Sequence, residues 1–143
     1  MTALERLQAA RSLIAQGWTQ HATARRANDR AAVPAYDSEA VSFCAAGALL
    51  ATDDLGLGGG ALETCGPLLI KNLPAPATER HVDLIRVITD FNDHPRTTQA
   101  DVLALYDHTT EKAEAAIIMW LIRDYRDSKV HPHCNWDHLK EGS

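Results

Sequence analysis

The sequence predicts a mainly α-helical protein, a compact bundle of about five helices with a small β-hairpin near residues 22–33. Apolar residues recur along most of the chain at the three- and four-residue spacing of amphipathic helices. Capping residues precede several of these stretches, and glycine or proline follows them. The 143 residues, 45% of them hydrophobic, are enough for one core without disulfide bonds. We therefore expect one helical domain over residues 1–128 and a polar, histidine-rich tail over residues 129–143.

The first helix is expected to begin near Thr2. Thr2 and Glu5 have the spacing of a capping box, in which side chain and backbone cap each other. Leu7 and Ile14 belong to its apolar stripe. Gly17 is expected to adopt the left-handed conformation that ends many helices.

The next stretch, residues 19–36, lacks helical periodicity. Asn28 and Asp29 are turn formers, and they stand between two short segments at 22–26 and 30–33. This pattern predicts a small β-hairpin or an extended arm.

Asp37 has the character of an N-cap for a second helix. Val41, Cys44 and Ala48 follow at the spacing of a buried face. Residues 45–48 are all alanine or glycine, so this helix is thin and another backbone segment can approach it closely. We expect it to be central.

A third helical piece is expected over residues 61–72, interrupted by Gly66 and Pro67 because proline disrupts a helix interior. Thr78 is the expected cap of a fourth helix. The core face of that helix is predicted to be Val82, Ile85, Ile88 and Phe91.

A sharp turn is expected at residues 92–95. Thr98, with Asp101 three residues later, then opens a long helical stretch that Thr109 and Thr110 could break. The apolar side of this stretch is predicted to be Val102, Leu103, Tyr106, Ala113, Ile117, Trp120 and Leu121.

Charge and cysteine usage narrow the class of protein. The net charge of −5 argues against non-specific nucleic-acid binding, which needs clustered cations, and it is compatible with docking onto a basic partner. Cys44, Cys65 and Cys134 are odd in number and widely spaced, which fits a reducing compartment. The longest apolar run, residues 115–122, is too short to span a bilayer, and Glu5 and its neighbours interrupt any secretion signal. We expect a soluble, cytoplasmic protein that does not bind membranes.

Five motifs occur in an order that resembles a family of small bacterial and phage proteins, a domain of unknown function. The motifs are Leu-x-x-Ala-Arg-x-Leu-Ile at residues 7–14, Gly-Trp-Thr-Gln at 17–20, Ala-Arg at 24–25, Cys-Ala-Ala-Gly-Ala at 44–48 and Phe-Asn-Asp-His-Pro-Arg-Thr at 91–97. The resemblance covers about residues 4–110 and implies no activity, since the family has none assigned. The extension beyond about residue 112 has no counterpart in the family, so a function housed there would be particular to this protein.

Cys44 is the candidate nucleophile of the matched region. A cysteine near a helix N-terminus can be stabilised as the thiolate, and Asn92 or His94 could assist it in a small hydrolase or transferase. The alternative is a small core residue, because free cysteine is among the most buried residue types.

Asn92 and Asp93 are candidates for ligand binding, in a polar pocket completed by Trp18, Arg25 and Arg96. The alternative is turn chemistry, since asparagine tolerates unusual backbone angles and aspartate caps nearby amides.

The tail carries a metal-like cluster of His131, His133, Cys134 and His138. Imidazole and thiolate groups suit zinc, although adjacent His133 and Cys134 cannot easily face one ion. The alternative is a polar tail or an arm that contacts a partner, in which Trp136 would be an interface anchor.

These observations favour a small non-enzymatic binding or accessory protein, because the chain holds no complete catalytic constellation. It would act by contact with a host macromolecule, expected to be a host protein, for example as an inhibitor of a host defence system. The alternatives are a cysteine-dependent enzyme that uses Cys44 and a module stabilised by zinc in the tail. No other cofactor is expected.

Overall fold

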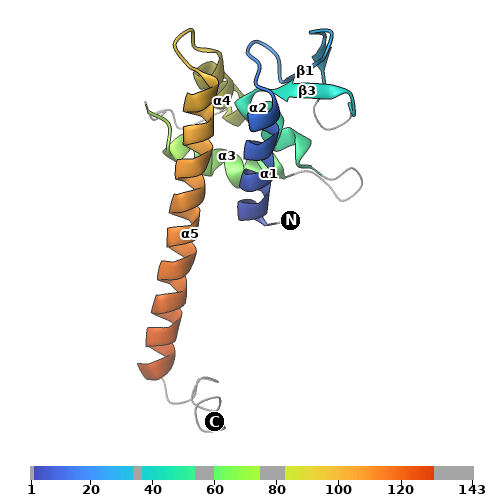
Figure 1. Ribbon diagram of the computed structural model, residues 1–143. Coiled ribbons are helices and arrows are strands. Elements are labelled where there is room, and N and C mark those ends of the chain that lie inside the picture. The colour runs from blue at the N-terminus through green and yellow to red at the C-terminus, as the bar shows by residue number, and fades with distance from the viewer. Residues whose placement is uncertain (1, 34–36, 54–59, 75–82, 131–143) are drawn as a thin grey trace. The chain divides into compact units, whose positions relative to one another are not determined.

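The computed structural model describes residues 2–33, 37–53, 60–74 and 83–130 (Figure 1). The chain divides into two units, Met1–Thr110 and Glu111–Ser143, and each is described by itself. The helices in the described residues are α1 (Ala3–Gln16), α2 (Ala45–Ala51), α3 (Ala61–Lys71), α4 (Leu84–Asp93) and α5 (Gln99–Val130). The strands are β1 (Ala24–Arg26), β2 (Ala31–Ala32) and β3 (Ala40–Phe43).

The three strands form one antiparallel sheet in the order β2-β1-β3. The predicted hairpin is confirmed as β1 and β2, in which Ala24 pairs with Ala32. The mainly helical class is also confirmed, but the third strand makes the fold a helical domain with a small sheet and not a pure bundle.

Helix α1 begins as predicted, with the Thr2 hydroxyl accepting a hydrogen bond from the Glu5 N–H at 3.2 Å. Its buried residues are Leu7, Ala10 and Ile14. The predicted left-handed conformation of Gly17 is wrong, because its φ of −171° is ordinary extended backbone. Glycine is needed there for another reason, since a Cβ would collide with the Val41 carbonyl oxygen of β3.

The second helix begins later than predicted. Asp37 lies ahead of β3, and α2 starts only after Cys44, which is its N-cap. The prediction failed because four residues carry too little periodicity to separate a strand from a helix. Pairing with β1, in which Ser42 lies opposite Arg25, places residues 40–43 in the sheet. Val41, predicted on a buried helical face, is therefore a strand residue and is 49% exposed.

The prediction that α2 is central is confirmed. Residues 45–49 are all buried, and a Cβ on Gly47 would overlap the Thr23 carbonyl oxygen. The Cys44 N–H donates to that same oxygen at 3.0 Å. The Tyr106 hydroxyl donates to the Ala45 carbonyl oxygen at 2.6 Å, so α2 is held on two sides.

Helix α3 is continuous through Pro67, so the predicted interruption is wrong. Proline removes the N–H that would bond the carbonyl of Glu63, four residues earlier. Both residues are exposed, so water can satisfy that carbonyl.

Helix α4 begins after Asp83, whose carboxylate accepts from the Arg86 N–H at 3.2 Å. The predicted cap Thr78 and core residue Val82 lie outside the described residues. Ile88 is fully buried, as predicted, but the prediction of Ile85 as a core residue is wrong, because Ile85 is 40% exposed. The predicted turn is partly wrong, because residues 92–93 are the last two of α4.

Helix α5 opens with the predicted capping box, in which the Asp101 N–H donates to the Thr98 hydroxyl and the Thr98 N–H donates to the Asp101 carboxylate. The predicted break at Thr109 and Thr110 is wrong. Their hydroxyls donate to carbonyl oxygens four residues earlier, at 2.7 and 2.8 Å, and so remain within the helical pattern.

The core of the first unit is formed by α1 to α4 and the beginning of α5. Its largest fully buried apolar side chains are Leu7, Ile14, Leu49, Leu69, Ile88, Val102 and Tyr106. In the described part of the second unit, by contrast, the predicted core residues Ile117, Trp120 and Leu121 are about half exposed or more, with exposed fractions of 47%, 62% and 53%.

Candidate functional site

A buried polar junction forms where the end of α4 meets the segment after α1. The side chain of Asn92 is 0% exposed. Its oxygen accepts from the Trp18 indole N–H at 2.8 Å and from the Ala45 N–H at 2.9 Å. Its nitrogen donates to the Thr19 carbonyl at 3.0 Å and to the Asp93 carboxylate at 2.9 Å. These four bonds use the full capacity of the amide, so Asn92 holds the fold together and leaves nothing for a ligand.

The residues around Asn92 extend this junction. The Gln20 side chain donates to the carbonyl oxygens of Asn92 and His94, at 2.9 and 3.1 Å. The Asp93 carboxylate accepts from the His21 N–H at 2.9 Å. Gln20 was not predicted as a site residue, although it lies in the Gly-Trp-Thr-Gln motif.

The predicted polar pocket is assembled only in part. Trp18, Asn92 and Asp93 meet directly. Arg25 contacts the Thr19 hydroxyl at 3.0 Å and thus reaches the junction through its neighbour. Arg96 is exposed, and its main-chain N–H donates to the His94 ring nitrogen. The predicted anchor Trp136 lies outside the described residues.

The surroundings of Cys44 are those of a packed side chain. Only 1% of the residue is exposed, and its sulfur accepts from the Gly47 N–H at 3.2 Å. Burial raises the pKa of the Cys44 thiol, which keeps it protonated at neutral pH. His94 is exposed, and the described contacts include no hydrogen bond from it to Cys44. The thiol therefore lacks both the exposure and the low pKa of a nucleophile.

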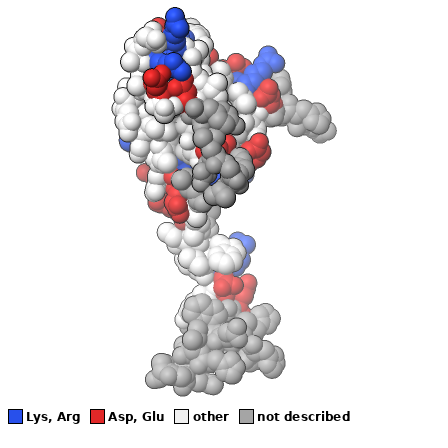
Figure 2. Space-filling view, turned by 90° about the vertical axis from the view of Figure 1, so that its right-hand side faces the viewer, with Lys and Arg blue, Asp and Glu red and all other residues white. Residues whose placement is uncertain are grey.

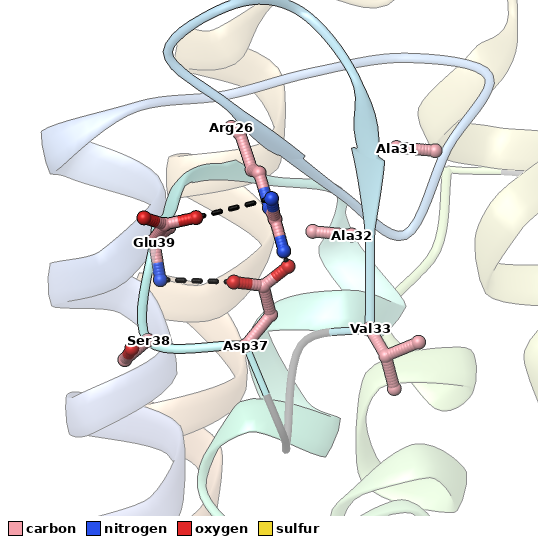
Figure 3. Close-up of a pocket in the computed structure, with 7 residues that line it drawn as sticks. All are labelled: Arg26, Ala31, Ala32, Val33, Asp37, Ser38 and Glu39. Atoms are coloured by element: carbon pink, nitrogen blue, oxygen red, sulfur yellow. Dashed lines mark hydrogen bonds and ion pairs between the residues drawn. The ribbon is translucent and has the colours of Figure 1, made fainter.

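An open cavity of about 490 Å³ lies beside the sheet (Figure 3). It is lined by Arg26, Ala31, Ala32, Val33, Asp37, Ser38 and Glu39. The Arg26 guanidinium contacts Asp37 at 2.8 Å and Glu39 at 3.0 Å, and the Glu39 N–H donates to Asp37. The hydrogen bond from Arg26 lowers the pKa of the Asp37 carboxyl. The charged groups of the cavity thus pair with one another, which favours a structural role.

The charge distribution offers no broad basic surface on the face that Figure 2 shows. There, the Lys and Arg side chains of the described residues lie beside Asp and Glu side chains. Among the described residues, Arg6 forms an ion pair with Asp53 at 2.9 Å and Arg11 forms one with Asp107 at 2.6 Å.

The described residues contain no group of three or more His, Cys, Asp or Glu side chains that could hold a metal ion. The predicted zinc ligands His131, His133, Cys134 and His138 lie outside the described residues, so the zinc site stays a prediction. The helices that the structure describes include none of the length and apolar character that crossing a membrane requires.

Among the described residues, the part of α5 after residue 110 carries the most exposed apolar surface. Six consecutive large apolar residues are between 44% and 62% exposed: Ile117, Ile118, Met119, Trp120, Leu121 and Ile122. Successive helical residues differ by about 100° in direction, so six in a row surround the helix. Contiguous exposed apolar surface of this kind marks interaction sites. The sequence feature that could have indicated this exposed surface is the unbroken apolar run at residues 115–122, which leaves the helix no polar side.

Comparison with known proteins places the first unit in a family. No curated protein and no solved structure matches the chain. Residues 1–112 match a family of unknown function, DUF6197, which covers the first unit and ends two residues beyond it. Because the match includes most of the sequence, the chain belongs to the family of unknown function DUF6197.

Proposed function

We propose that the protein is a small non-enzymatic binding protein of bacterial or phage origin that acts by contact with a host protein, for example to inhibit a host defence system. The observation that carries the proposal is the exposed apolar face of α5 that contains Ile117, Trp120 and Leu121. Its place after the residues that match the family makes it a feature of this chain and not of the family match.

One face of this helix has the composition of a binding hot spot. Ile117, Trp120 and Leu121 lie at the i, i+3 and i+4 spacing of one helical face. Tryptophan is the residue type most enriched among side chains that dominate interface energies. Full burial of one large apolar side chain contributes about 1.5–3 kcal/mol, and covering the exposed part of these three side chains would add a share of that to the binding free energy.

The buried thiol of Cys44 argues against the alternative, a cysteine-dependent enzyme. A cysteine-dependent enzyme needs an accessible thiolate, whereas burial raises the pKa of Cys44 and the Gly47 N–H occupies its sulfur. The alternative enzymatic function therefore finds no support in the geometry around Cys44.

Affinity capture from a lysate of the bacterial host tests the proposal. Immobilised full-length protein is expected to retain a host protein, and Trp120→Asp is expected to weaken that binding by about tenfold or more, because it places a charge in the contact. Ile85→Asp is the matched control, since Ile85 is a 40% exposed apolar residue on α4. Equal capture by the wild type and Trp120→Asp, or capture of nothing by the wild type, would contradict the proposal.

A further inference from the structure

A second face of α5 carries charged residues at both ends and apolar residues between them. With about 100° between successive residues, the members of this face fall within an arc of about 100°. They are Glu111, Ala115, Ile118, Met119, Ile122 and Arg126, and all six are exposed. We call this set the Glu111–Arg126 face, and Trp120 points away from it on the opposite side of the helix.

The Glu111–Arg126 face is complementary to itself when it is reversed. Glu111 and Arg126 are equally distant from the midpoint between Ile118 and Met119, and so are Ala115 and Ile122. Two copies related by a two-fold axis through that midpoint would therefore place each residue opposite its counterpart. Glu111 of each copy would face Arg126 of the other, at both ends of an apolar centre.

We propose that a second copy of this chain packs antiparallel against the Glu111–Arg126 face, forming a symmetric dimer. The two ion pairs lie about 22 Å apart along the helix, from 15 steps of about 1.5 Å. Between them, Ile118, Met119 and Ile122 become buried, and their exposed fractions are 57%, 58% and 44% in the single chain.

Charge selects this orientation over the alternatives. A parallel pair would place Glu111 opposite Glu111 and Arg126 opposite Arg126, and like charges in register are destabilising. The opposite face, with Ile117 and Trp120, is bordered by the carboxylates of Glu114 and Asp124. In residues 111–127 the cationic side chains, Lys112, Arg123 and Arg126, lie on the other side of the helix, so the Trp120 side has no such complementarity.

This dimer is independent of the proposed function, because it uses a different face of α5. An interface of one helical face about 22 Å long is smaller than the usual 1,200–2,000 Å² of stable complexes. A reversible association that depends on protein concentration is therefore expected.

Analytical ultracentrifugation of the full-length protein tests the dimer. The wild type is expected to pass from dimer to monomer on dilution. Glu111→Arg and Arg126→Glu are each expected to raise the dissociation constant by about tenfold, because each reversal creates two repulsive pairs. The double variant is expected to return the dissociation constant to the wild-type value, since the exchanged charges face each other again. The two positions are 15 residues apart in the helix, so this rescue cannot arise within one chain.

Glu114→Arg and Arg123→Glu are the matched controls, because they make the same charge changes off the face. They are expected to leave the dissociation constant within about threefold of the wild type. Circular dichroism confirms that each variant is folded. A wild type that stays monomeric at every concentration, a dimer insensitive to the single reversals, or a double variant that is not restored would overturn the proposal. A monomer that Ile118→Asp destabilises would also overturn it, because the face would then be covered by the chain itself.

The two proposals, the dimer and the contact with a host protein, can be contradicted independently. Trp120→Asp is expected to weaken capture of the host protein and to leave the dimer intact. Glu111→Arg is expected to do the reverse.

Discussion

The side-chain amide of Asn92 makes four hydrogen bonds in a site that solvent does not reach. Its orientation matters, because the oxygen faces two N–H donors while the nitrogen faces a carbonyl and a carboxylate. A carboxylate in its place would set an acceptor against the Thr19 carbonyl and a second charge beside Asp93. The site is therefore selective for an amide and not merely for a polar residue.

Asn92→Asp is expected to lower the free energy of unfolding by about 3 kcal/mol, because it leaves a buried charge among acceptors. Urea unfolding followed by circular dichroism measures this loss. Asp90→Asn, an exposed position on the same helix, is the control and is expected to change stability by less than about 0.5 kcal/mol. A loss below about 1 kcal/mol for Asn92→Asp would mean that the junction contributes little.

At the scale of elements, the contact between α2 and the segment before β1 depends on the absence of a side chain at Gly47. Alanine is normally the better helix former by about 1 kcal/mol. Here the overlap of its Cβ with the Thr23 carbonyl outweighs that gain, since backbone cannot move aside as easily as the end of a side chain.

Gly47→Ala is expected to destabilise the protein by about 2 kcal/mol in thermal or urea unfolding. Gly66→Ala provides the opposite case within the same fold. Gly66 is also helical, but a Cβ there would make ordinary contacts with Leu84 and Leu62, at 3.5 and 3.6 Å. Gly66→Ala is therefore expected to raise the free energy of unfolding by about 0.5–1 kcal/mol. If both substitutions changed stability in the same direction, the explanation by close approach of the Thr23 carbonyl to Gly47 would be wrong.

The elements predicted from sequence were those with local signals. The caps of α1 and α5 could be predicted because each is formed by two residues three positions apart, Thr2 with Glu5 and Thr98 with Asp101. Strand β3 was missed because its strand character depends on pairing with β1, which lies about 15 residues earlier. Pro67 was read as a break because local preference cannot show that its neighbours face solvent.

At the scale of the whole molecule, three buried acidic groups give stability a common dependence on alkaline pH. Burial raises the pKa of Cys44, Cys65 and Tyr106, the last well above its usual range. Above pH 9.0 for the two cysteines and pH 10.0 for Tyr106, the unfolded chain releases these protons while the folded chain keeps them. The unfolded state then binds fewer protons, so stability falls as pH rises.

Tyr106→Phe tests this dependence. At pH 7 the variant is expected to lose about 1 kcal/mol with the hydrogen bond to Ala45. Above the ordinary tyrosine pKa only the wild type loses stability by keeping this proton, so its advantage is expected to fall by about 1.4 kcal/mol per pH unit and to reverse by about pH 11. Urea unfolding at pH 7, 9, 10 and 11 measures it, and a constant difference would show that Tyr106 does not titrate on unfolding.

The exposed apolar surface of α5 was the part of the described residues that sequence patterns predicted least well. The stripe of Ile117, Trp120 and Leu121 was predicted as core because helical spacing alone does not distinguish a core from an interface. Trp18 and Asn92 were correctly paired as neighbours, since both belong to motifs of the family resemblance. Their role in holding the fold followed only from the bonds between them.

The hydrogen bonds of Asn92 join segments that are far apart in the chain. The bonds to Trp18 and Thr19 span 74 and 73 residues, and the bond to Ala45 spans 47. Contacts of such long sequence separation slow folding, because chain entropy is lost before they form. Helices α1 and α5 can start from their own caps, whereas this junction can close only after α4 has packed against the start of α2 and the segment that follows α1. Changes at Asn92 should therefore act mainly on the rate of unfolding and leave the rate of folding nearly unchanged.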